Sequence, residues 1–177
     1  MRYTAIVSLT PYRLRPAEGG DIHEIAVMSR CLIEVGLRGW TWHPTRVARA
    51  LRARETCVLA AETPFANAPD RLAGFAIAEF GDTKMHLSLL AVKPAYQRSG
   101  IGLAMIEWLI ESALTAGIDH ITVEMRANNF AARSFYEALG FRRQQYIGGY
   151  YQNIEAAIRM RRDLHQNATL RESRKTY

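Results

Sequence analysis

The second half of the chain carries a carboxyl group and a phenol that could move protons in a reaction. Glu124 lies in the otherwise apolar, strand-like run 120–125, where a partly buried carboxylate can accept a proton directly or through water. Tyr136 lies on the helical stretch 130–139, where its hydroxyl can donate one. We therefore expect Glu124 as general base and Tyr136 as general acid, with Glu79 as an alternative base.

Both side chains also have a structural alternative. Glu124 can be an outward-facing carboxylate that pairs with an arginine at the surface. The ring of Tyr136 can simply pack between a helix and the sheet.

A glycine-containing turn between an apolar strand and an amphipathic helix could hold an anion. Gly100 and Gly102 lie where the helix begins, and there unpaired backbone N–H groups and the helix dipole favour negative charge. Arg98 can add a charge-assisted contact. The chain has no Gly-x-x-x-x-Gly-Lys-Ser/Thr and no glycine-rich turn after a first βαβ strand, which disfavours a P-loop and a dinucleotide fold. A diphosphate cofactor of another fold remains, although paired glycines also serve tight turns.

Two blocks of sequence resemble motifs of one enzyme family. The run 97–102, Gln-Arg-Ser-Gly-Ile-Gly, is similar to the Gln/Arg-x-x-Gly-x-Gly pyrophosphate loop of the GNAT superfamily of acetyl-CoA-dependent N-acetyltransferases. The block 124–141 resembles the later motif of that superfamily, especially in RimI-like protein N-terminal acetyltransferases. The resemblance covers roughly residues 71–164. The first section, the segment 40–44 and the tail depart from the RimI-like pattern.

The resemblance implies a fold, a cosubstrate and a set of contacts. The fold would be α/β of the mixed α+β kind, with a central, mostly antiparallel mixed sheet of about seven strands flanked by about four helices. The cosubstrate would be acetyl-CoA, with no metal. The implied contacts are the backbone of Leu90, Ala91 and Val92 for the thioester and pantetheine, Arg98, Ser99, Gly100, Ile101, Gly102 and Leu103 for the diphosphate, and Asn129 for the pantetheine arm. Asn129 is equally a good helix N-cap.

The implied reaction needs the two proton-transfer groups. An amine attacks a thioester only when neutral, whereas a lysine-type ammonium has a pKa near 10.4 and an α-ammonium about 8. The resemblance to RimI-like enzymes points to Glu124 as the base that removes this proton. Tyr136 matches the position of the acid that protonates the departing thiolate. A backbone N–H near Val92 would stabilise the oxyanion.

The acceptor of the acetyl group is a primary amine whose identity stays open. Tyr146, Tyr150 and Tyr151 surround a loop that, in RimI-like enzymes, helps to line the acceptor groove. Aromatic rings at such a loop can grip a peptide or a small amine, and they are also ordinary packing residues. A protein N-terminus and a small molecule are thus both candidates. A non-catalytic acetyl-CoA sensor is a further alternative, which would need neither proton-transfer residue.

Periodicity and turn residues predict the elements that position these groups. Apolar runs rich in β-formers indicate strands, and amphipathic runs that end at glycine indicate helices. The predicted strands are 12–15, 56–62, 71–80, 85–92, 120–125, 141–146 and 154–163, with the last two joined by a loop at Gly148 and Gly149. The predicted helices are 21–37, with Asp21 as N-cap, 45–54, 101–116 and 130–139.

Composition sets the broad class of protein. With 177 residues, 49% of them hydrophobic, the chain predicts one domain over 1–164 and a polar tail over 165–177. No apolar run approaches the roughly 20 residues that span a bilayer, and no secretory signal is recognisable, so we expect a cytoplasmic protein without membrane contact. Cys31 and Cys57 have no metal or disulfide spacing and are expected to be reduced core residues.

The net charge of +6 raises nucleic-acid binding as a rival function. The arginine-rich run 159–162 motivates it, but no recognised motif supports it. We therefore expect no nucleic-acid partner, and a homodimer stays open.

Overall fold

A seven-stranded mixed sheet organises residues 12–63 and 71–165, the part of the chain that the computed structural model describes. The strands are β1 (Arg13–Pro16), β2 (Thr56–Glu62), β3 (Leu72–Phe80), β4 (Lys84–Val92), β5 (His120–Arg126), β6 (Arg142–Tyr151) and β7 (Glu155–Asp163). The α-helices are α1 (Ile22–Met28), α2 (Pro44–Arg52), α3 (Ile101–Thr115) and α4 (Phe130–Ala138). The predicted mixed α/β fold, with about seven strands and about four helices, is confirmed within these residues.

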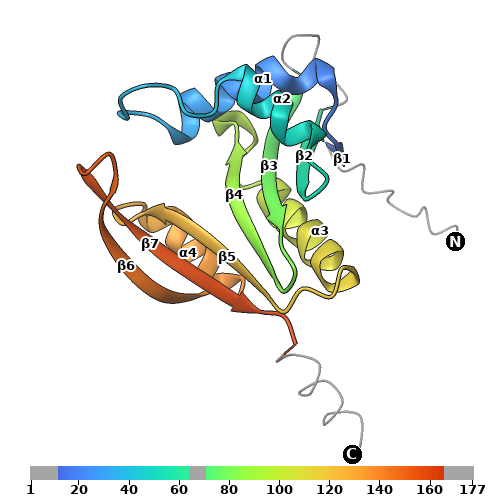
Figure 1. Cartoon of the computed structure of the whole chain (residues 1–177). Helices are drawn as coiled ribbons and strands as arrows, with labels where there is room; N and C mark the ends of the chain where they lie inside the picture. The colour runs from blue at the N-terminus through green and yellow to red at the C-terminus, as the bar shows by residue number, and fades with distance from the viewer. Residues whose placement is uncertain (1–11, 64–70, 166–177) are drawn as a thin grey trace, which may run out of the picture.

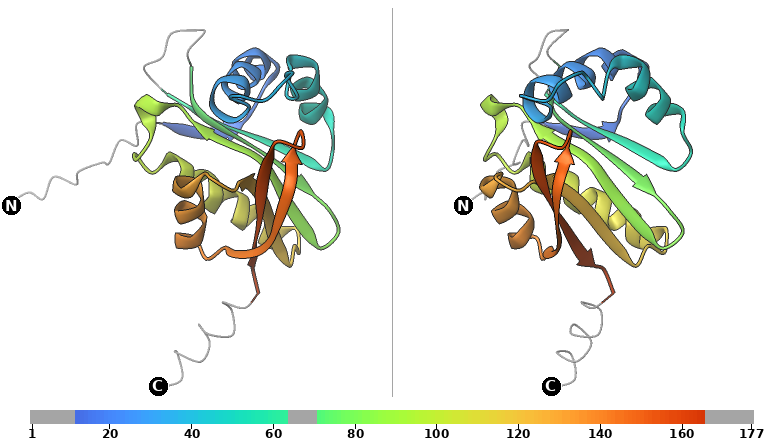
Figure 2. Two further views of the ribbon diagram at one scale, coloured as in Figure 1. Left: turned by 90° about the vertical axis from the view of Figure 1, so that its left-hand side faces the viewer. Right: turned by 60° about the vertical axis from the view of Figure 1, so that its left-hand side comes forward.

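The strands lie in the order β1-β2-β3-β4-β5-β7-β6. Every neighbouring pair is antiparallel except β4 and β5, which are parallel. The connection between these two strands is α3, as a parallel crossover requires. Helices α1 and α2 cover one face of the sheet, and α3 and α4 cover the other (Figures 1 and 2).

Each face of the sheet has its own apolar cluster. On one face, the side chains of α3 that lie a helical turn apart, such as Met105, Leu109 and Ala113, are fully buried against the sheet. On the other face, Ile25 of α1 and Val47 of α2 are fully buried. The buried side chains of α3 thus lie on one face, as expected of an amphipathic helix, and Gly117, with a φ of 75°, follows its end.

A β-bulge on β4 exchanges the two faces of that strand. Ile77 of β3 pairs with Leu89, whereas the next residue, Ala78, pairs with Leu87, so Ser88 is the extra residue. Leu87 consequently packs in the cluster under α3, and Leu89 packs in the cluster under α1 and α2.

Strands β4 and β5 separate after a short paired stretch. Their register runs from Lys84 opposite His120 to Leu87 opposite Val123 and then ends. Beyond this point the two ribbons diverge, and the second half of β4 and the end of β5 lie on opposite sides of a gap (Figure 1). The sheet is thus open at its centre, on the side toward which β4 and β5 both run.

Two predicted elements differ from the observed ones. The helix predicted over 21–37 ends earlier, because α1 passes into a wider π-helical turn, Ser29–Ile33. Glu34 follows that turn and accepts backbone N–H groups from Thr41 and Trp42 at 2.6 and 2.9 Å, which ties down the loop instead of extending the helix. Strand β6 continues through the predicted loop at residues 148–149 to Tyr151, so the hairpin turns later.

Cys31 also departs from expectation, because it is exposed, while Cys57 is half-buried. No helix within the described ranges is both long and apolar enough to span a membrane. The single domain over 1–164 and the tail over 165–177 stay predictions, since residues 1–11, 64–70 and 166–177 lie outside those ranges.

Asp21 is the N-cap residue of α1, as the sequence predicts, but its side chain makes no capping hydrogen bond to that helix and is instead the centre of a buried ion pair. Its carboxylate, 0% exposed, lies 2.6 Å from Nη1 of Arg15 and 3.0 Å from Nη2 of Arg71. It also accepts the backbone N–H of Glu18 at 2.8 Å. Burial acts to raise the pKa of Asp21, but the hydrogen bonds from Arg15 and Glu18 and the nearby positive charges outweigh it, and the pKa is lowered.

Replacing Asp21 by Asn should lower the free energy of unfolding by about 3 kcal/mol at pH 7, because it leaves the guanidinium of Arg15 short of its main buried partner. The pKa of Asp21 is lower in the folded than in the unfolded chain. The stabilisation is therefore present above the unfolded carboxyl pKa and is lost as the pH falls through the folded one. Urea unfolding at pH 7 and in acid measures both effects.

The control is Asp82→Asn, which changes an exposed turn carboxylate and should alter the unfolding free energy by less than about 0.5 kcal/mol. Equal midpoints for wild type and Asp21→Asn at pH 7 would contradict a stabilising role for the pair.

Candidate active site

A cleft of about 780 Å³ occupies the gap between β4 and β5. Its walls come from the ends of these two strands, from the segment that follows α1, from α4 and from the β6–β7 hairpin. The two proton-transfer candidates, Glu124 and Tyr136, both line it. So do Leu90, Asn129 and the alternative base Glu79. The structure therefore brings together in one cavity groups that lie far apart in the sequence.

Glu124 is nearly buried and held at both carboxylate oxygens. Its side chain is 9% exposed, with Oε1 at 2.6 Å from Nε of Arg159 and Oε2 at 3.1 Å from Nε2 of His86. A hydrogen bond also links it to Tyr150, whose pKa is raised first by burial and then by the negative charge of Glu124. Glu124 is thus paired with an arginine, as the structural alternative expects, but its side chain is nearly buried and lines the cleft.

Glu79 has different surroundings from Glu124. It is exposed at the end of β3 and accepts a hydrogen bond from the hydroxyl of Ser88 at 2.9 Å. Both carboxylates line the cleft, but Glu124 alone of the two is joined to an arginine and a histidine there.

Tyr136 lies at the inner end of the cleft. The residue is 5% exposed, and its ring packs edge-on against Phe135 and Phe141, with centroids 5.2 and 5.3 Å away. Burial raises the pKa of its phenol, so the hydroxyl stays protonated in neutral solution. The hydroxyl makes no hydrogen bond to any residue that the structure describes. It is therefore free to donate to a group in the cleft, and the packing role expected from sequence is fulfilled at the same time.

The glycine turn lies outside the cleft lining, at the start of α3. Gly100 precedes the helix with a φ of 86°, a conformation that favours glycine, and a Cβ there would meet open space. The first backbone hydrogen bond of α3 runs from Ala104 to the Gly100 carbonyl at 2.9 Å. Within the described ranges the N–H groups of residues 101–103 have no acceptor, as at an uncapped helix end.

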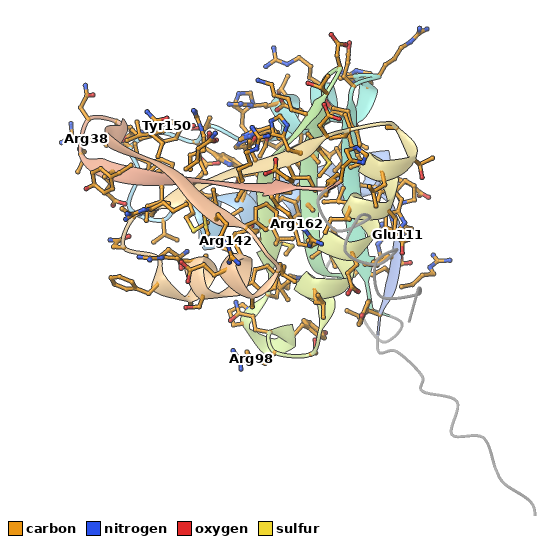
Figure 3. All side chains as sticks on the ribbon, turned by 90° about the horizontal axis from the view of Figure 1, so that it is seen from below. Arg38, Arg98, Glu111, Arg142, Tyr150 and Arg162 are labelled. Atoms are coloured by element: carbon orange, nitrogen blue, oxygen red, sulfur yellow. The ribbon has the colours of Figure 1, made fainter. Side chains whose placement is uncertain are left out.

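The surroundings of Gly102 differ from those of Gly100. A Cβ on Gly102 would point at the ring of Phe135, 3.5 Å from Cζ, and not into open space. A Cβ at Gly102 would therefore be in ordinary van der Waals contact with α4, whereas Gly100 provides the open turn. Arg98 adopts a positive φ of 63° in the same turn and is exposed; Figure 3 shows its side chain.

The end of strand β4 connects the glycine turn with the cleft. The carbonyl of Val92 accepts the side-chain amide of Gln97 at 3.0 Å, which ties the turn to the end of β4. Leu90 lines the cleft, and Ala91 and Val92 follow it toward the turn. Of the predicted cofactor contacts, Leu90 and Asn129 lie in the cleft lining. The other predicted contacts lie between the end of β4 and the first turn of α3: Ala91, Val92, Arg98, Ser99, Gly100, Ile101, Gly102 and Leu103.

Asn129 is the N-cap of α4. Its Oδ1 accepts the backbone N–H of Ala132 at 3.0 Å. Its amide NH₂ donates to no other residue in the described part of the chain, and Asn129 lines the cleft. Capping and a contact with a ligand are thus compatible.

The outer wall of the cleft is braced by side chains that the sequence did not single out. Arg126 pairs with Glu155 at 3.1 Å and donates to the backbone carbonyls of Ile33 and Val35. Its guanidinium also lies over the ring of Tyr151, 5.8 Å from the centroid. These contacts join the end of β5 to the segment after α1 and to the β6–β7 hairpin.

A second brace crosses from Arg38 to Gln152. The N–H of Arg38 donates to Oε1 of Gln152 at 2.8 Å, and the Gln152 amide donates back to the Arg38 carbonyl. Figure 3 shows Arg38 and Tyr150 at the same end of the molecule. Of the three tyrosines expected to surround the acceptor, Tyr150 and Tyr151 line the cleft and the exposed Tyr146 does not.

Sequence reasoning missed His86 and Arg159, the two partners of Glu124. His86 pairs with Glu79 in the β3–β4 register, and Arg159 is directly opposite Glu124 in the β5–β7 register. Strand alternation could have found them only together with the correct register. Within the described ranges, no three His, Cys, Asp or Glu side chains gather in a way that could hold a metal ion.

Known proteins similar to this chain share both the sequence pattern and the fold. A family model described as the acetyltransferase (GNAT) family matches residues 18–141. The ribosomal protein bS18-alanine N-acetyltransferase of Salmonella typhimurium is 40% identical over 96 residues, which are 52% of this chain and 65% of that protein. The chain thus spans less than two thirds of the length of this curated relative.

Two solved structures extend the comparison. The crystal structure of the ribosomal-protein-S18-alanine N-acetyltransferase of Escherichia coli has a TM-score of 0.68 and 25% identity, over 86% of this chain and 94% of that one. The PaiA N-acetyltransferase of Thermoplasma acidophilum, solved in complex with coenzyme A, has a TM-score of 0.69 and 18% identity, over 86% and 98% of the two chains. At that identity the second similarity concerns the fold alone.

Proposed function

The chain belongs to the acetyltransferase (GNAT) family, and we propose that it transfers an acetyl group from acetyl-CoA to the α-amino group of a protein N-terminus. Glu124 and Tyr136 share one cleft that opens where β4 and β5 separate, and this placement carries the proposal. A base that deprotonates the acceptor ammonium and an acid that protonates the departing thiolate, placed in one cavity, are what acyl transfer from a thioester to an amine requires.

The cosubstrate would lie along the second half of β4, with its diphosphate at the start of α3. The unpaired N–H groups of residues 101–103 and the positive end of the helix dipole suit a diphosphate there. The edge of β4 that β5 leaves after Leu87 offers backbone groups to the pantetheine arm at Leu90, Ala91 and Val92. The amide of Asn129 can donate to the same arm. When bound, acetyl-CoA supplies the acyl thioester, and the chain supplies orientation and proton transfer.

Each of the two proton-transfer groups has one task in this proposal. Glu124 removes a proton from the acceptor ammonium, directly or through one water molecule, and the neutral amine then attacks the thioester. Tyr136 gives its proton to the departing sulfur, which its buried and neutral phenol is suited to do. A backbone N–H near Val92 would face the developing oxyanion.

The protein acceptor is favoured by the similar enzymes and by the outer wall of the cleft. The relative from Salmonella typhimurium is named for the alanine of a ribosomal protein. In this chain the cleft is flanked by the segment after α1 and by the β6–β7 hairpin, with Tyr150 and Tyr151 inside it. Rigid aromatic rings between two segments of backbone suit an extended peptide.

A thiol-release assay tests the acceptor class. Purified protein with acetyl-CoA would be offered peptides with free N-termini, the same peptides with blocked N-termini, and free amines such as polyamines and aminoglycosides. Release that requires the free peptide N-terminus supports the proposal. Turnover of small amines alone would select the small-molecule alternative, and acetyl-CoA binding without any turnover would select the sensor. A cytoplasmic location and a homodimer stay predictions.

Leu103→Glu should weaken acetyl-CoA binding without destabilising the fold. Leu103 is 40% exposed in the first turn of α3, where a carboxylate would compete with the diphosphate but would interact favourably with the helix dipole. We expect a dissociation constant at least about tenfold higher, or about 1.4 kcal/mol, with an unchanged or higher Tm of the free protein. Calorimetry and thermal unfolding measure the two quantities.

The matched control is Leu114→Glu, which puts the same charge at the other end of α3, where Leu114 is 44% exposed. It should bind acetyl-CoA as the wild type does. If Leu103→Glu also binds normally, the diphosphate does not lie at this helix end.

Glu124→Gln should reduce kcat by about 100-fold or more, the usual contribution of a general base, while acetyl-CoA binding stays as in the wild type. Glu79→Gln, the corresponding change at the alternative base, should reduce kcat far less. Steady-state kinetics with one acceptor peptide, after a check of Tm for both variants, makes the comparison. The reverse order of effects would assign the base to Glu79.

Tyr136→Phe removes one hydroxyl that forms no hydrogen bond to the described residues, so the Tm should change little. The kcat should fall by about 10- to 100-fold, because the thiolate would depart without a proton donor. Tyr146→Phe removes an exposed tyrosine hydroxyl outside the cleft lining and serves as the control. A Tyr136→Phe enzyme with full kcat would leave Tyr136 a packing residue only.

A further inference from the structure

The surroundings of Glu124 raise the question of where the proton from the acceptor amine stays during the reaction. Oε1 of Glu124 lies 2.6 Å from Nε of Arg159, whose guanidinium neither loses nor gains a proton at any working pH. Protonating Glu124 would leave this positive charge facing a neutral acid. A carboxylate beside a fixed cation can therefore pass a proton on, but it holds a proton less readily than a carboxylate without that cation.

His86 offers a better place at the other carboxylate oxygen. Its Nε2 lies 3.1 Å from Oε2 of Glu124, the length of an N–H···O hydrogen bond, so a proton bound at Nε2 would lie between the two atoms. The pair can therefore hold the one proton that the acceptor amine gives up. A free imidazole takes up its proton near pH 6.5, about two units above a free glutamate, and an imidazolium would donate a charge-assisted hydrogen bond to Oε2.

A hydrogen bond at Nδ1 of His86 can select the tautomer whose Nε2 accepts a proton. Nδ1 of His86 lies 3.0 Å from the hydroxyl of Thr122 on the neighbouring strand β5. When Nδ1 carries its hydrogen and donates to that hydroxyl, Nε2 is left with a free lone pair toward Glu124. The threonine hydroxyl can accept this hydrogen bond in both charge states of the ring.

The other charged groups around His86 come from four strands. Glu79 on β3 is its register partner, and Glu124 on β5 is in direct contact with its ring. Arg159 on β7 is on the far side of Glu124, which also bonds to Tyr150 on β6. The ring of His86 thus has one carboxylate in direct contact, a second carboxylate on its register partner, and one guanidinium beyond Glu124.

We infer that His86 is a positioning residue that takes up, through Glu124, the proton lost by the acceptor amine. The inference rests on the proposed function. An N–H bond of the ammonium breaks, an N–H bond forms at Nε2 of His86, and Glu124 is a carboxylate before and after the transfer. The products are a neutral amine and an imidazolium, so charge and protons balance. His86 is half-exposed at 32% of its side chain, so water can remove the proton after each turnover.

The first test is the pH profile of kcat/KM for His86→Gln with an acceptor peptide. Glutamine keeps a polar side chain of similar reach but cannot take up the proton. We expect kcat/KM at pH 7.5 to fall at least about tenfold and the acid limb of the profile to move to lower pH, because the remaining acceptor is a carboxyl group. His120→Gln is the control, since His120 is another half-buried histidine of the sheet that does not line the cleft.

A purely structural role would lower the rate without moving the acid limb, so an unmoved limb in a folded His86→Gln protein overturns the inference. Thr122→Val provides a second variant that keeps the histidine. It should reduce kcat/KM by a smaller factor, because the ring loses the hydrogen bond that selects its tautomer.

A titration by NMR separates failure of this inference from failure of the proposed function, because it needs no turnover. The ring signals of His86 are followed with pH in the wild type and in Glu124→Gln. The titration midpoint should move to lower pH in the variant, since the imidazolium loses its negative partner while Arg159 keeps its charge. An unchanged midpoint would show that the two groups do not share a proton, whatever the enzyme acetylates.

Discussion

The separation of two parallel strands is the constraint on which the rest of this molecule depends. β4 and β5 pair only as far as Leu87 and Val123 and then diverge, which leaves the cleft at the centre of the sheet. Backbone groups along such an opening lack their usual partners, and burying them without partners is costly. The open edge of β4 is therefore tolerable because the cleft is accessible, and it is useful because a ligand with amide groups can pair with it.

The opening is held at a fixed width by contacts on its outer side. Arg126 and Gln152 connect the β6–β7 hairpin and the end of β5 to the segment after α1. Within the cleft, Glu124 joins β4 to β7 through His86 and Arg159. The same carboxylate thus connects the two sides of the opening and is the proposed proton acceptor, so its charge serves the architecture and the proposed chemistry together.

Much of the fold could be predicted from the sequence, because its elements have strong local signals. The alternation along β4 and the apolar face of α3 are local patterns, and the glycine turn before α3 has its own signature. The early end of the first helix could not be predicted, because it depends on the side chain of Glu34 reaching across to a loop. The partners of Glu124 were missed for a related reason: His86 and Arg159 meet it only through the pairing of three strands, and register is not a local property.

The bulge at Ser88 has a consequence for how β4 can change during evolution. Met85, Leu87, Leu89 and Ala91 alternate in the sequence as if they formed a single buried face, yet the first two pack beneath α3 and the last two beneath α1 and α2. The extra residue, Ser88, changes the face of the strand on which each following residue lies. Deleting Ser88 would restore an uninterrupted pleat in which Leu89 still lies on the face opposite to Leu87, so Leu89 and Ala91 would keep their layer. A single-residue deletion elsewhere in β4 would instead turn the residues on one side of it to the wrong layer, so the bulge is the position at which the length of this strand can change.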